Sequence, residues 1–66
     1  MSDYYTGSIE DGIALFHEGV KHINNARSDT GRSKLQQAKR IFELCKDTDL
    51  EAKSWLVKTN QELSNI

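Results

Sequence analysis

Apolar residues recur at helical spacing in the first third of the chain. The intervals between them are four, three, four and three residues, which places their side chains in one stripe along a helix. The stripe consists of Ile9, Ile13, Phe16, Val20 and Ile23. Ser8 and Asp11 fit a capping box, in which the serine oxygen accepts an early backbone N–H and a carboxylate reaches back toward the cap. The pattern therefore predicts a helix that begins at Ser8.

Turn-forming residues follow this first helix. The two asparagines at positions 24 and 25 weaken the helical pattern, and residues 28–31 read Ser-Asp-Thr-Gly, which is typical of a turn. We therefore expect the first helix to end near Ala26 and a second helix to begin between Thr30 and Ser33.

The second helix has a broad apolar face. The side chains predicted to face inward are Leu35, Ala38, Phe42 and Cys45, widened by Ile41 and Leu44. Thr48 with Glu51 repeats the capping-box pattern, so the second helix should end by Asp47 and a third should begin at once. A connection this short places the two helices antiparallel to each other.

The third helix also has one apolar side. This side carries Ala52, Trp55, Leu56, Thr59, Leu63 and Ile66. The chain has no proline, and no alternation of β-branched residues is long enough for a strand. The sequence therefore predicts an all-α fold, either a three-helix bundle or a repeat-like antiparallel helical hairpin with a third packing helix. In this interpretation residues 8–66 form a single three-helix domain, and residues 1–7, with Tyr4 and Tyr5, form a loose N-terminal lead-in.

Large and small residues follow a definite order through these three helices. The residues in question are Leu15, Gly19, Ala38, Phe42, Cys45, Ala52 and Leu56. Their order resembles a degenerate tetratricopeptide repeat followed by the first helix of another repeat. The resemblance implies that Gly19 lets the first two helices approach closely, with Ala38 at their contact. It also implies that Phe42 and Cys45 pack between the second and third helices. The three-helix microtubule-interacting and trafficking domain is a second resemblance of the same kind.

The first helix has two faces that point in different directions. Gly12, Leu15 and Gly19 form a small-residue face, and the apolar stripe described above forms the other. If the small-residue face packs on the second helix, the stripe is left for the third helix, for a partner helix or for a second copy of the chain. We expect one end of the stripe to be internal, at Val20 and Ile23. The residues predicted to contact a partner or a second copy are Ile9, Ile13 and Phe16.

Charge is distributed unevenly, although the formal net charge is only −1. Residues 1–20 hold only acidic groups, whereas residues 21–46 hold seven Lys or Arg against two acids. Such a basic segment is suited to contact with phosphates or with an acidic protein surface. Its predicted partner-binding residues are Arg32, Lys39 and Arg40. Nucleic-acid binding is the less favoured interpretation. The third helix begins Asp49-Leu50-Glu51, which places carboxylates where a recognition helix would approach DNA phosphates.

No residue pattern indicates catalysis or a bound cofactor. Cys45 is the single cysteine, and His17 and His22 are five residues apart, unlike the helical metal pair spaced by four. We therefore predict no catalytic residue, no cofactor and no metal. No apolar run approaches the roughly 20 residues that span a bilayer, and no secretory signal pattern is present. The sequence thus favours a reduced, cytoplasmic protein.

These observations favour a small non-enzymatic protein–protein interaction module, an adaptor or a regulator of a larger protein partner. The alternative is a nucleic-acid-associated regulator that uses the basic segment 21–46.

Overall fold

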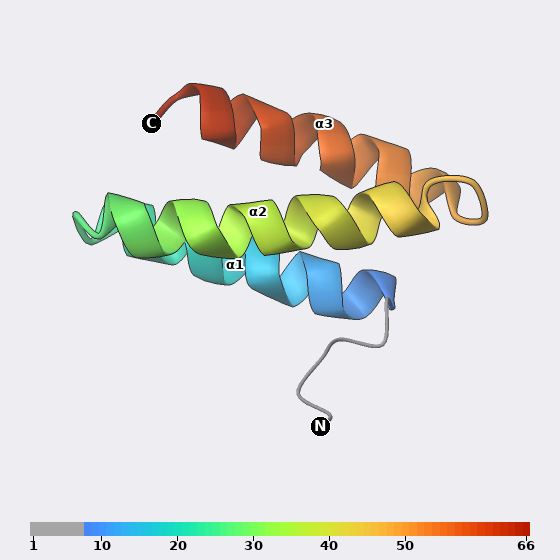
Figure 1. Ribbon diagram of the computed structural model, residues 1–66, viewed down its shortest axis with the longest axis horizontal. Helices are drawn as coiled ribbons and strands as arrows, with labels where there is room; N and C mark the ends of the chain where they lie inside the picture. The colour runs from blue at the N-terminus through green and yellow to red at the C-terminus, as the bar shows by residue number, and fades with distance from the viewer. Residues whose placement is uncertain (1–7) are drawn as a thin grey trace.

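The chain folds into three helices, which the computed structural model describes over residues 8–66 (Figure 1). They are α1 (Ile9–Asn24), α2 (Ser28–Cys45) and α3 (Leu50–Ser64). The all-α prediction is confirmed, and the described residues contain no strand. The predicted lead-in, with Tyr4 and Tyr5, lies outside the described residues.

Ser8 caps the start of α1, as the sequence predicts. Its hydroxyl oxygen accepts the backbone N–H groups of Glu10, at 3.1 Å, and of Asp11, at 3.4 Å. These bonds satisfy two of the donors that every helix leaves unpaired at its first turn. Side-chain caps of this kind typically stabilise a helix by about 1 kcal/mol.

Only three residues join α1 to α2. The backbone N–H of Arg27 donates to the carbonyl of His22 at 2.8 Å, and that of Ala26 donates to the carbonyl of Ile23 at 3.1 Å. This pair of bonds is a Schellman motif, and it holds Ala26 at a φ of 64°, in the left-handed region. The motif reverses the chain so quickly that α2 begins at Ser28. The prediction of a turn over residues 28–31 is therefore wrong, because these residues form the first turn of α2.

Glycines bring α1 and α2 into backbone contact. The buried residues of α1 are Gly12, Leu15 and Gly19. A Cβ atom on Gly19 would lie 3.0 Å from the carbonyl oxygen of Gly31, and one on Gly31 would lie 2.7 Å from the carbonyl oxygen of Gly19. A Cβ atom on Gly12 would lie 2.7 Å from the ring of Phe42. The predicted close approach at Gly19 is therefore present, and Gly31 is its counterpart on α2.

The core lies between these two helices and the first half of α3. Its buried apolar residues are Leu15, Leu35, Ala38, Ile41, Phe42 and Ala52. Phe42 has the largest fully buried side chain of the described residues. The predicted inner face of α2 is confirmed except at Leu44, which is 72 % exposed.

Asp49, and not Thr48, caps α3. Asp49 has the extended backbone of an N-cap residue, and its carboxylate accepts the N–H of Glu51 at 3.0 Å. The Thr48 hydroxyl instead donates to the carbonyl of Cys45 at 3.2 Å, an acceptor that also receives the backbone N–H groups of Thr48 and Asp49. The prediction of a Thr48 cap is therefore wrong, and α2 ends at Cys45, two residues before the predicted limit.

The three helices form a flat arrangement with α2 in the middle (Figure 1). The principal extents are 34 × 29 × 13 Å. α1 and α3 both pack along α2, but they touch each other only sparsely. A side chain of α1 that points toward α3 is therefore covered incompletely.

Phe42→Ala should unfold much of the protein. Truncation of a buried Phe typically costs about 3–5 kcal/mol, and a domain of this size has a stability of roughly 3–5 kcal/mol. Thermal melting followed by circular dichroism measures the loss. The matched control is Leu44→Ala on the exposed side of the same helix, which should melt like the parent. Equal melting of Phe42→Ala and the parent would contradict the core assignment.

The two turn residues can be compared directly. Asp49→Ala should lower the free energy of unfolding by about 1 kcal/mol, because the N–H of Glu51 loses its acceptor. Thr48→Ala should cost less, within about 0.5 kcal/mol, since it removes only an exposed bond. Denaturant titration of both variants tests the order, and a larger loss for Thr48→Ala would refute the Asp49 cap.

Gly31→Ala should destabilise the fold although alanine is the better helix former by about 1 kcal/mol. The new Cβ atom would meet the carbonyl oxygen of Gly19, a backbone atom, so the two helices would have to separate. Overpacking of this kind typically costs about 1–3 kcal/mol. Ser33→Ala, at an exposed position of the same helix, is the control. A higher melting temperature for Gly31→Ala would show that α1 and α2 are not in backbone contact.

Candidate functional site

The apolar stripe of α1 is the first candidate interaction surface. All five of its side chains are half-buried, because α1 presents its small-residue face to α2 and α3 covers only part of the stripe. Within the stripe, Phe16 meets Trp55 of α3 edge to face, with ring centroids 5.3 Å apart. Phe16 therefore lies on the side of α1 that faces α3. At the other end of the stripe, Ile23 lies against Gly31 of α2, so this end is partly internal.

Trp55 is the centre of an aromatic cluster that joins all three helices. Its ring stacks on Phe42 at 6.0 Å and meets the edge of His17 at 5.7 Å. The Nζ atom of Lys58 lies 4.6 Å from the Trp55 ring centroid, within the range of a cation–π contact. One turn further along α3, the buried Thr59 donates its hydroxyl to the carbonyl of Trp55 at 2.8 Å. The cluster joins α3 to α1 at Phe16 and His17, and the other residues of the stripe are half-buried.

The predicted partner-binding residues lie on two separate surfaces. Ile9, Ile13 and Phe16 are half-buried and pack against the core cluster around Phe42. Their partner role stays a prediction.

The predicted cations lie on α2. Arg32 and Arg40 are exposed, whereas Lys39 is half-buried. Neither arginine makes an ion pair with a described residue. Lys34, on the other hand, pairs with Glu18 of α1, with Nζ 3.4 Å from Oε1. The structure thus separates the predicted cations from the predicted apolar contacts.

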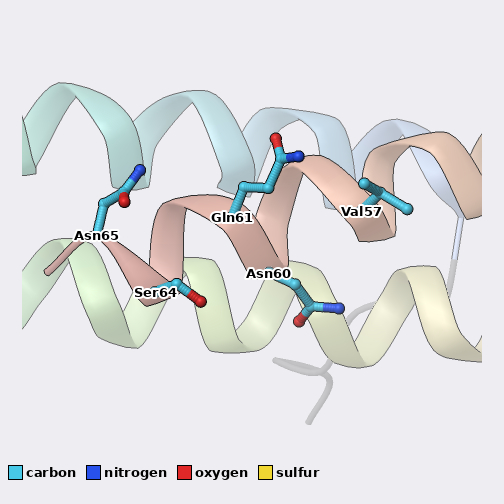
Figure 2. A pocket seen from close by; sticks show the side chains of 5 residues that line it. All are labelled: Val57, Asn60, Gln61, Ser64 and Asn65. Atoms are coloured by element: carbon cyan, nitrogen blue, oxygen red, sulfur yellow. The ribbon is translucent and has the colours of Figure 1, made fainter.

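The outer face of α3 is a surface that the sequence analysis did not identify. Leu50 is 83 % exposed and Val57 is 56 % exposed. Next to Val57 lies an open depression of about 460 Å³, lined also by Asn60, Gln61, Ser64 and Asn65 (Figure 2). Four of the lining residues belong to α3 and the fifth, Asn65, is its C-cap residue; none of the five is charged.

The remaining chemistry of the described residues is sparse. Over residues 8–66, no group of three or more His, Cys, Asp and Glu side chains is arranged to hold a metal ion. Cys45 is half-buried at the end of α2. None of the three helices is both long enough and apolar enough to cross a lipid bilayer.

In comparisons of the chain with protein-family models, with curated proteins and with solved structures, no match is found.

Proposed function

We propose that this protein is a non-enzymatic protein–protein interaction module of the cytoplasm, an adaptor or a regulator of a larger partner. The observation that carries the proposal is the incompletely covered apolar stripe of α1. The resemblance to a tetratricopeptide repeat supports it, because the helices of such repeats present their open faces to neighbouring helices or to ligands.

The stripe has the form of a helix-binding surface. Its side chains follow one side of α1 for four turns, so an amphipathic helix laid along it would meet apolar contacts at every turn. Each further square ångström of apolar surface removed from water contributes about 25 cal/mol. Ile9, Ile13 and Phe16 offer the part of this surface nearest the core cluster. Val20, which the sequence predicts to be internal, is half-buried and does not pack on that cluster, so it extends the surface toward the other end of α1.

The alternative function is a nucleic-acid-associated regulator. The observation that favours it is that Arg32 and Arg40 project from α2 without an ion-pair partner among the described residues. The two functions differ in their response to salt, since phosphate contacts weaken steeply as salt is raised, whereas apolar contacts do not.

Val20→Asp should abolish partner capture and leave the helices intact. Val20 is half-buried and, unlike Ile13 and Phe16, does not pack against the core cluster. A carboxylate there would remain hydrated in the free protein and lose its water in a complex. The measurement is affinity capture from the native host with quantitative mass spectrometry, with circular dichroism as the check of folding.

Ala14→Asp is the matched control, because Ala14 is an exposed position of the same helix. Proteins that the parent and Ala14→Asp retain and that Val20→Asp loses are the expected partners. Capture that is equal for all three variants would refute the stripe as the binding surface. Loss of capture between low and moderate salt, together with recovery of nucleic acid, would favour the alternative function.

A further inference from the structure

A row of uncharged residues runs along the exposed side of α3. Its members are spaced by four, three, four and three residues, and all are exposed. They are Leu50, Ser54, Val57, Gln61 and Ser64. The four charged residues of the helix lie outside this row. Residues with this spacing form the seam along which two helices pair in a coiled coil.

The depression on α3 lies beside this row and shares three residues with it, Val57, Gln61 and Ser64. Four of its lining residues, Val57, Asn60, Gln61 and Ser64, occupy positions i, i+3, i+4 and i+7 (Figure 2). In a coiled coil, four residues at this spacing form the hole that receives one side chain of the facing helix. Leu50 belongs to the same row, one heptad before Val57, and is the most exposed large apolar side chain of the described residues. α3 therefore carries both a protruding side chain, Leu50, and a hole of four residues that can receive such a side chain.

We propose that α3 pairs with α3 of a second copy of this chain, antiparallel and about a two-fold axis. Leu50 of each copy then enters the depression of the other copy. The axis crosses α3 between residues 55 and 56, and in this register Val57 of each copy enters the hole next to Leu50 of the other. A contact of this kind is isologous, so the symmetry closes at a dimer.

The charges beside the seam agree with this arrangement. Antiparallel pairing in the stated register places Glu51 of each copy opposite Lys58 of the other, and it places Lys53 opposite Asn60. Parallel pairing would instead bring Lys53 of one copy next to Lys58 of the other, which is repulsive. The five positions of the row itself are uncharged, and Lys53 borders the hole that receives Val57. In the antiparallel register, the charges beside the α3 row thus complement those of a second, identical α3.

The dimer should be weak. α3 has 15 residues and is therefore roughly 22 Å long. Two helices of this length bury less than the roughly 1,600 Å² of a standard interface. The inference rests on the proposed function and deepens it, because a dimer through α3 leaves both α1 stripes free. Two stripes in one particle would strengthen binding to a partner that carries two sites.

Sedimentation equilibrium of the purified chain, from about 10 µM to about 1 mM, tests the pairing, since weak interfaces dissociate in this range. We expect a monomer–dimer equilibrium that Leu50→Asp abolishes. Leu44→Asp is the matched control, because Leu44 is similarly exposed but lies on α2; its dissociation constant should equal that of the parent. A parent that stays monomeric over the whole range would overturn the proposal.

Charge reversal tests the register. Lys58→Glu should raise the dissociation constant at least about tenfold, because two pairs of carboxylates would then face each other. Glu51→Lys combined with Lys58→Glu should return it to within about threefold of the parent, since the opposite charges are restored. Both variants lose the contact between Lys58 and Trp55, so that loss cancels in the comparison. Failure of the double variant to recover would overturn the antiparallel register.

The same variants keep the two proposals apart. Leu50→Asp should still capture partners through α1, and Val20→Asp should still dimerise through α3. Equal capture by the parent and Val20→Asp, with the dimer intact in both, would remove the proposed function and leave the α3 pairing standing. Loss of the dimer in Val20→Asp, with Leu50→Asp unaffected, would place self-association on the α1 stripe and refute the α3 pairing.

Discussion

Backbone contact between α1 and α2 is the constraint on which the rest of the structure depends. Gly19 and Gly31 allow the two helices to meet without intervening side chains, and Gly12 leaves room for the ring of Phe42. Because α1 presents its small residues to α2, most of its large apolar residues lie on a neighbouring side of the helix, away from the glycine contact. α3 is the remaining element that can cover them, and it reaches them chiefly at Phe16. The half-exposed stripe is therefore a direct consequence of the glycine contact.

The position of α3 is set by a short turn and by one side chain. Asp49 starts the helix, and Trp55, less than two turns later, packs on the ring of Phe42. Ala52 and Thr59 are buried on the same side of α3. With these residues facing α2, helical periodicity directs Leu50 and Val57 to the opposite side of α3. Their exposure follows from how α3 is anchored, since no further helix within residues 8–66 covers that side.

Helical periodicity alone predicts the number of helices, their antiparallel order and most of the buried residues. It fails where tertiary contact overrides a local preference. Gly31 is typical of a turn, yet it lies inside α2 because only glycine fits against Gly19. Thr48 and Asp49 both have capping side chains, and the extended backbone of Asp49 decides between them. Ile41 and Leu44 lie on the same edge of the apolar face of α2. Ile41 is buried next to Gly12 of α1, whereas Leu44 lies further round the helix and stays exposed. Apolar periodicity does not predict the α3 row, because only two of its five residues are apolar. What the five residues share is a 4-3-4-3 spacing and the absence of charge.

The small size of the domain links its stability to its interactions. A domain with a stability of roughly 3–5 kcal/mol has little margin. A ligand at 100 times its dissociation constant adds about 2.7 kcal/mol if it binds only the folded state. The three helices leave the apolar α1 stripe half-covered and leave two apolar side chains of the α3 row, Leu50 and Val57, exposed, so covering either surface adds burial that the isolated chain lacks. A small core thus leaves the protein only marginally stable alone, and binding at either surface would stabilise the same fold.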